Sequence, residues 1–410
     1  MFARYWAPAA LAAALAGPAA AGPLTYTEAL AKAQASAPSL VAAGLRTEAA
    51  RREAVAAGRL PDPQLRIALE NFPVSGPMAG SLGGDEMTMA TIGVMQAFPN
   101  SARRRAETDG ARASAASALA QEAITGREIR VATALAWIDL YYAQARLSAL
   151  NAVLAELTPL WDAAPAAVAN ASSRPASALM PIRLRADLED QRDELKASVG
   201  RAQAELTRWT GETSPQASGS PPPPHVAPET LKADLPKHST LAAYDAESRR
   251  ATAAVDLARS ETRPDFGVEA GYGRRDPMFG DMISAGVTVR LPLYASRRQG
   301  PVIQARQADA ARIDIEREMA RRGLTAAFEA DVADHVMHHD QWLRARDVLV
   351  PAARQQADLE TASYAAGRAS LSDVLQAFTD VAQTRLTVLE REAAVARDAV
   401  RITLTYGAEP

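Results

Sequence analysis

The chain carries the same order of sequence features twice, and this duplication constrains its fold more than any other property. Each half begins with two short helical stretches, continues with two strand-like runs and ends in a long helical hairpin. The turn from helix to strand reads G-R-L-P-D at residues 58–62 and E-T-R-P-D at residues 261–265. A repeat of roughly 190 residues is too long for a solenoid unit, whose period is about 20 to 50 residues. The sequence therefore predicts a duplicated, pseudo-symmetric architecture.

The first 21 residues have the features of a secretory signal peptide. Arg4 supplies the positive start, residues 9–16 form a short apolar core, and the alanines at 19–21 precede the expected cleavage before Gly22. The chain has no cysteine, which excludes disulfides, thiolate metal sites and a lipid-modified N-terminal cysteine. We therefore expect an exported protein that is not a lipoprotein.

The expected domain order follows the duplication. A first repeat at residues 22–211 has strands at about 63–99 and a helical hairpin at about 103–211. A proline-rich linker at 212–225 leads into a second repeat at 226–410, with strands at about 265–295 and a hairpin at about 297–407. Pro159 and Pro351 hold equivalent places in the long helices, which predicts a kink at each. Apolar residues of the returning helices, within 195–209 and 375–404, are spaced as seams for partner helices.

The strand-like runs alternate between apolar and polar residues, which predicts a sheet with two different faces. In the last run, Ile283, Val287 and Val289 share one face, while Ser284 and Thr288 share the other. A run of about 10 residues is long enough for a tilted strand to cross a bilayer. Two strand pairs cannot close a barrel alone, and open edges in lipid leave backbone groups unpaired. We therefore expect other chains to complete the sheet.

Composition and motifs narrow the function. A net charge of −3 gives no basis for a nucleic-acid partner, and no phosphate-binding loop or nucleophile motif indicates an enzyme or a cofactor. His335 and His339 lie one helical turn apart and are candidate metal ligands, although a solvated helix face is the favoured interpretation.

Arginines at 103–105 and 297–298 are expected to anchor at an interface. Methionines gather near the strands, where soft cation binding and ordinary apolar packing are the alternatives, and they are Met78, Met87, Met89, Met95, Met278 and Met282.

One motif carries a family resemblance. Residues 364–377 read Y-A-A-G-R-A-S-L-S-D-V-L-Q-A, which resembles the helical-hairpin tip of TolC-family outer-membrane efflux proteins. The strand exits at residues 98–99 and 291–294 are most similar to the CzcC-like heavy-metal efflux branch. The tip of the first repeat, around residues 171–179, is degenerate, because Pro175 and Ser177 replace the family's Leu and Asp. The resemblance covers essentially the whole mature chain.

This resemblance implies a mostly α fold with a small transmembrane β part, in which three chains form a 12-stranded β-barrel continued by a long α-helical barrel. It implies an exit duct in the bacterial outer membrane that extends into the periplasm. The expected partners are outer-membrane lipid, a periplasmic adaptor (membrane fusion protein) and a resistance-nodulation-division inner-membrane pump. Heavy-metal cations are the expected cargo. A drug-efflux or type I secretion duct is the alternative, and a soluble periplasmic coiled-coil adaptor is a remote one.

The same resemblance implies the residues of a periplasmic gate. Asp373 and Gln376 are the expected gate residues. The hairpin tip around them is expected to contain Tyr364, Gly367, Leu371 and Leu375. For Asp373 an ordinary structural role stays open, since an acidic residue is favoured in the first turn of a helix.

Overall fold

The computed structural model describes residues 22–169 and 179–407. The chain divides into two compact units. One, here called the helical unit, consists of residues 1–38, 126–231 and 328–407, and the other, the strand unit, of residues 39–125, 232–327 and 408–410. Each unit combines segments from both halves of the sequence. The expected signal peptide and most of the degenerate first tip lie outside the described residues.

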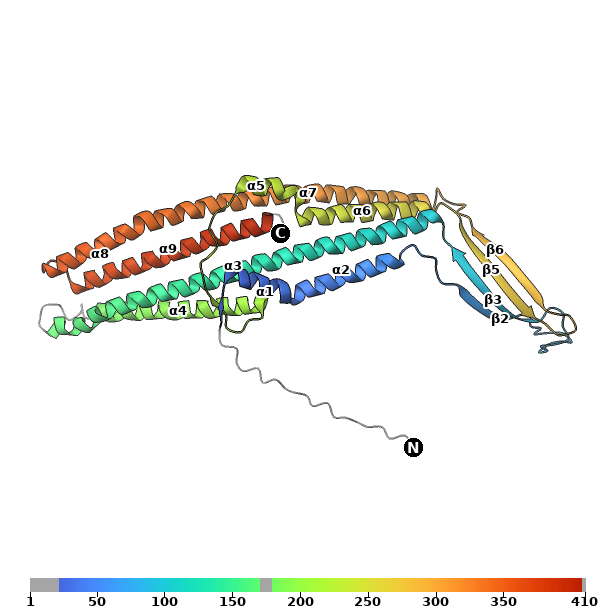
Figure 1. Cartoon of the computed structure of the whole chain (residues 1–410), viewed down its shortest axis with the longest axis horizontal. Helices are drawn as coiled ribbons and strands as arrows, with labels where there is room; N and C mark the ends of the chain where they lie inside the picture. Colours follow the sequence, from blue (N-terminus) through green and yellow to red (C-terminus); the bar gives the residue numbers. More distant parts are fainter. Residues whose placement is uncertain (1–21, 170–178, 408–410) are drawn as a thin grey trace, which may run out of the picture. The chain divides into compact units, whose positions relative to one another are not determined.

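The strand unit contains one antiparallel sheet of four strands in the order β2, β3, β5, β6 (Figure 1). The strands are β2 (Gln64–Glu70), β3 (Met89–Phe98), β5 (Asp265–Arg274) and β6 (Met282–Arg290). β3 pairs with β5 over nine residues, so the strand pairs of the two halves form a single sheet. β2 has seven residues, fewer than the sequence predicts. It ends before Asn71, whose positive φ of 56° is a conformation that a strand cannot contain.

Along the chain, helices of the strand unit come before and after each pair of strands. They are α2 (Pro38–Ala56), α6 (Ser239–Ser260) and the first parts of α3 (Ser101–Ala169) and α7 (Gln299–Arg344). Gly58 starts the helix-to-strand turn with a φ of +71°. A Cβ there would lie 2.4 Å from the Arg104 carbonyl oxygen of α3, so only glycine lets α2 end this close to α3.

The helical unit is built around Trp137, which is fully buried on α3. Its ring stacks on Tyr141 at 5.4 Å and meets Tyr26 edge-on at 5.6 Å. Its indole N–H donates to the Leu24 carbonyl at 2.8 Å, which satisfies the one polar atom of the ring. Leu24 belongs to β1 (Pro23–Leu24), which pairs in parallel with β4 (Gln216–Ala217). The segment just before α1 (Tyr26–Ser36) is therefore tied to the linker.

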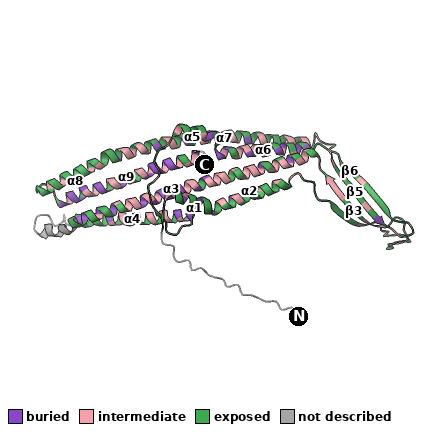
Figure 2. Cartoon of the chain, in the orientation of Figure 1, coloured by how far each residue is buried: buried purple, intermediate pink, exposed green. Residues whose placement is uncertain are grey.

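The predicted seams of the returning helices are confirmed. α4 (Leu179–Thr210) buries Leu195 and Leu206, and α9 (Leu371–Tyr406) buries Leu375, Leu386 and Val400 among others. Figure 2 shows buried residues along the helices, while most strand residues are exposed or half-buried. Full burial of one such side chain stabilises a fold by about 1.5–3 kcal/mol, so the seams hold each hairpin to its neighbours.

The two matched prolines differ in effect. Before Pro351, residues Ala345–Leu349 form a π-helical turn, in which the Val350 N–H donates to the Ala345 carbonyl, and α8 (Val350–Ala365) follows. A proline ring crowds the carbonyl four residues earlier, and a wider turn relieves this clash. α3 continues past Pro159 without such an interruption.

The proline-rich linker also has contacts of its own. Residues Pro221–Pro224 line a cavity of about 80 Å³ together with Tyr142 and Trp342. The chain then enters α5 (Pro228–Asp234) and a 3-10 turn at Leu235–Lys237. Across residues 22–169 and 179–407, no helix combines the length and apolar character needed to cross a bilayer.

Candidate functional site

One face of the four-stranded sheet is almost entirely apolar and uncovered. The strand register brings Phe266 beside Val289 and Val268 beside Val287. Ile67 and Ile283, on the two outer strands, are 75% and 84% exposed. Large side chains of this face that are exposed are Leu65, Ile67, Leu69, Ile92, Val94, Phe98, Phe266, Val268, Tyr272, Ile283, Val287 and Val289. A continuous exposed apolar surface of this kind marks contact with a membrane or another protein.

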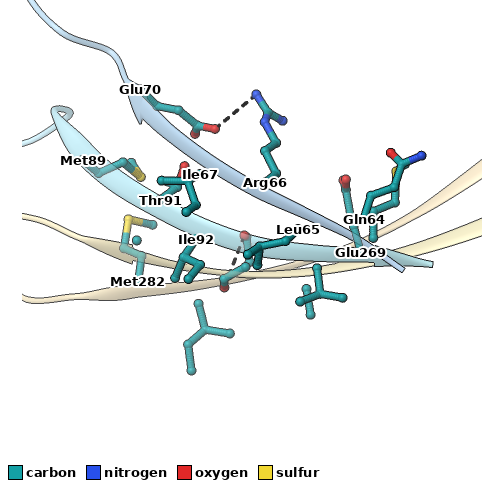
Figure 3. A pocket seen from close by; sticks show the side chains of 18 residues that line it. Gln64, Leu65, Arg66, Ile67, Glu70, Met89, Thr91, Ile92, Glu269 and Met282 are labelled. Atoms are coloured by element: carbon teal, nitrogen blue, oxygen red, sulfur yellow. Dashed lines mark hydrogen bonds and ion pairs between the residues drawn. The ribbon is translucent and has the colours of Figure 1, made fainter. Parts of the chain in front are cut away.

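The opposite face is polar and rich in glycine. It borders a hollow of about 780 Å³, and Figure 3 shows Arg66, Glu70 and Thr91 among the residues that line it. Arg66 and Glu70 form an ion pair at 3.5 Å. Glu269 lies over Gly286, where a Cβ would come within 2.6 Å of its carboxylate. In the described part of the chain, no hydrogen bond or ion pair engages Glu269, so it presents a free carboxylate on this face.

The sheet has two open edges. β2 and β6 each pair with one neighbouring strand, so within the described residues the outer side of each has no partner. Exposed edges of this kind offer backbone N–H and C=O groups to another strand. The sheet is therefore suited to joining further sheets edge to edge.

A polar cluster joins the sheet to the long helix. Asn100 is placed to cap α3, since its side-chain oxygen accepts from the Arg103 N–H at 2.9 Å. Its side-chain amide donates to Asp265 at 2.9 Å and to the Ser260 carbonyl at 3.1 Å. Arg103 lies 3.5 Å from Asp265, so the expected interface arginine is held at the strand exit. In the sequence, Asp265 is recognisable only as part of the turn motif at residues 261–265. The one local signal for this cluster is Asn100, a residue type that favours the position before a helix.

The hairpin tip of the helical unit lies between α8 and α9. Gly367 has a φ of +69°, which lets the chain reverse after α8. Tyr364 and Gln376 are exposed, while Leu371 and Leu375 are buried against the seam. Gln376 donates to Asp380 at 3.0 Å. The structure therefore divides the six predicted tip residues into two that pack the hairpin and four that lie at its surface.

Asp373 forms a capping box at the start of α9. Its carboxylate accepts from the Ser370 N–H and hydroxyl, each at 2.8 Å, and the Asp373 N–H donates back to the Ser370 hydroxyl. These hydrogen bonds hold the pKa of Asp373 below its usual value. In the single chain the residue thus has the capping role that the sequence left open, and its carboxylate stays ionised and exposed.

One of the three histidines of α7 contacts a buried carboxylate of α9. His338 Nδ1 and an oxygen of Asp398 lie 2.6 Å apart, and Arg401 contacts the same carboxylate at 3.2 Å. His335 is buried, and burial lowers its pKa, which Asp398 partly opposes. The rings of His335 and His339 are 6.3 Å apart. Among the residues that the structure describes, no group of three or more His, Asp or Glu side chains is arranged to hold a metal ion.

Charged side chains also connect α9 with α3 inside the helical unit. Arg397 bonds to Asp139, and Arg146 lies 3.9 Å from Glu390. The Tyr142 hydroxyl donates to Glu392 at 3.3 Å, and burial raises its pKa. All of these residues except Glu392 line a hollow of about 350 Å³ between α3, α4 and α9. The two hairpins therefore meet through polar contacts as well as through the seams.

Comparison with known proteins connects these features to a family. Residues 232–408 match the family model for outer membrane efflux proteins. The chain is 28% identical over 381 residues to the cobalt-zinc-cadmium resistance protein CzcC of Cupriavidus metallidurans, a match that covers 90% of this chain and 87% of that protein.

Solved structures share the fold. A membrane protein from Pseudomonas aeruginosa has a TM-score of 0.81 at 14% identity, with 93% of this chain and 92% of that one covered. The outer membrane protein VceC of Vibrio cholerae has a TM-score of 0.76 at 18% identity, with 94% and 97% covered. CusC, described as undergoing transmembrane channel formation, has a TM-score of 0.79 at 13% identity, with 94% and 92% covered. With the family match over its second half and this shared fold over most of its length, the chain is similar to outer membrane efflux proteins and has a TolC-like fold.

Proposed function

We propose that the protein is the outer-membrane exit duct of a tripartite efflux system. The observation that carries the proposal is the four-stranded sheet, which has an apolar exposed face, a polar opposite face and two open edges. In a bilayer an open edge leaves backbone groups without hydrogen bonds, which costs several kcal/mol for each group. Closure with other chains removes this cost.

Three copies of the sheet would supply twelve strands, enough for a closed barrel. β6 of one copy would pair with β2 of the next. The apolar face would contact lipid, and the polar face with Glu269 would line an aqueous interior. The long helices would continue this barrel into the periplasm, where a periplasmic adaptor and an inner-membrane pump dock.

The tip of the second hairpin is the proposed periplasmic gate. Three-fold symmetry would place three Asp373 carboxylates, each ionised and exposed, around one axis. Like charges at a constriction attract cations and repel anions. Capping and gating are compatible, because the capping bonds fix the position of the carboxylate without neutralising it.

Heavy-metal cations are the proposed cargo, supported by the resemblance to the cobalt-zinc-cadmium resistance protein. Such a duct conducts rather than catalyses, and its lining decides what passes.

Gene deletion tests the cargo directly. We expect a deletion strain to become sensitive to one or more of Co, Zn, Cd, Cu or Ag ions, and a plasmid copy to restore resistance. Sensitivity to drugs or dyes alone would contradict the metal assignment and favour the drug-efflux alternative. Failure of the purified protein to form conducting pores in planar bilayers would contradict the duct itself.

A further inference from the structure

Two methionines on the polar face of the sheet converge above one glycine. Met89 of β3 and Met282 of β6 lie on opposite sides of β5, on the same face as Thr91 and Ser284. Gly273 of β5 is directly opposite Met282 in the strand register. The Met89 sulfur lies 3.0 Å from the position that a Cβ on Gly273 would occupy.

The missing side chain at Gly273 explains this convergence. Residues opposite one another in neighbouring strands have Cβ atoms about 4.5–5.5 Å apart, so a side chain on Gly273 would separate Met89 from Met282. Without it, the Met89 thioether covers Gly273, which is buried as a result, and Met89 and Met282 line the same hollow. Figure 3 shows the two side chains extending toward one another from β3 and β6.

We propose that Met89 and Met282 form a two-thioether contact site for a soft monovalent cation, Cu(I) or Ag(I). Thioether sulfur is a soft, uncharged ligand that prefers these ions to Zn(II) or Co(II). Glu70, which is directly opposite Met89 in the register, places a carboxylate beside the site. This carboxylate also forms the ion pair with Arg66. The position of the site inside the duct rests on the proposed function, whereas the binding itself does not. Two neutral ligands bind weakly enough to release an ion, as conduction requires.

The remaining methionines near the strands offer internal controls. Met78 and Met278 lie in the loops between paired strands, and Met278 is 76% exposed. Met95 shares the strand and the face of Met89 but lies opposite Gln64 and Glu269. Each can bind an ion singly, but none is placed with a second thioether over Gly273.

Site-resolved protection from oxidation tests the proposal. The purified full-length protein, in detergent and chloride-free buffer, is treated with hydrogen peroxide at increasing silver nitrate concentrations, and peptide mass spectrometry follows each methionine sulfoxide. We expect Ag(I) to slow oxidation of Met89 and Met282 at least several-fold with one shared midpoint, while Met78 and Met278 stay unprotected at that concentration. Zinc sulfate should protect neither.

The coupling between the two residues is the decisive result. Met89→Leu should abolish protection of Met282, and Met282→Leu should abolish protection of Met89, whereas Met95→Leu should leave both protected. Unchanged protection of Met282 in Met89→Leu, or protection no greater than at Met278, would overturn the site. Equal protection by Zn(II) would overturn its soft character.

Pore formation by the same preparation separates this inference from the proposed function. Conducting trimers without coupled protection would refute the methionine site alone. Coupled protection in a protein that forms no pore would leave the site intact and refute its place in a duct.

Discussion

At the scale of single residues, Asp373 combines a structural contact with a proposed electrostatic role. The two can be separated because Ser370 is the other half of the capping box and carries no charge. Ser370→Ala should lower stability by about 1 kcal/mol, as loss of a helix cap does. It should leave the cation preference of the pore unchanged.

Asp373→Asn should have the complementary effect. Removing three carboxylates from the proposed constriction should reduce cation over anion selectivity and block by multivalent cations, measured as reversal potential and conductance in planar bilayers. If Asp373→Asn and Ser370→Ala both lower the thermal midpoint while selectivity stays at the wild-type value in each, Asp373 is a cap only and the gate lies elsewhere.

His335 gives stability a pH dependence of known sign. Burial depresses its native pKa below the value of about 6.5 for an unfolded histidine. Between the unfolded pKa and the lower native pKa, the unfolded chain binds this proton more readily than the folded protein does. The free energy of unfolding therefore decreases as pH falls through this range. The surrounding titratable groups are Asp398, which opposes the depression, and His338, His339 and His225, which add to it.

We expect the thermal midpoint to fall less between pH 7.5 and 5.0 in His335→Gln than in the wild type, at one scan rate. His225→Gln, a change at an exposed position that makes the smallest of these contributions to the His335 pKa, serves as the control and should stay much closer to the wild type than His335→Gln. An identical fall in all three proteins would contradict a role for His335 in the acid sensitivity.

At the scale of elements, the two faces of one strand should tolerate charge differently. Val94 and Met95 are neighbours near the middle of β3, and they belong to the apolar and the polar face respectively. Arg on the lipid side of a barrel near the bilayer midplane costs about 2–4 kcal/mol, whereas a residue facing the interior contacts water. Val94→Arg should therefore reduce heat-modifiable protein in outer-membrane fractions strongly, and Met95→Arg only slightly. Equal loss in both variants would contradict the assignment of the faces.

At the scale of the whole molecule, four strands with two free edges predict a defined assembly. We expect three mature chains, beginning at or near Gly22, in native mass spectrometry of protein extracted in mild detergent. Edge pairing should make this trimer resist mild detergent and dissociate on heating. A stable monomer inserted in membranes would contradict closure by three chains, and retention of residues 1–21 would contradict the expected signal peptide.

Much of the local structure was predictable because buried positions recur at a regular spacing of a few residues along a helix or a strand. The alternation in β6, the seam of α9 and the capping residue before α1 are all set by neighbours within a few residues. Thr25 and Thr27 are both suitable cap residues by type, and the structure identifies Thr25, whose hydroxyl accepts from the Glu28 N–H while its own N–H donates to the Glu28 carboxylate.

The sequence by itself determined the elements, their faces and the resemblance to a family, because each depends on periodicity or on a contiguous motif. Only the tertiary structure decided which distant residues meet. The pairing of β3 with β5, the bond between Asn100 and Asp265, the burial of Asp398 beside His338 and the approach of Met89 to Gly273 join residues 60 to 184 positions apart. No local pattern encodes such pairs, since they form only where the packing of whole elements brings the side chains together.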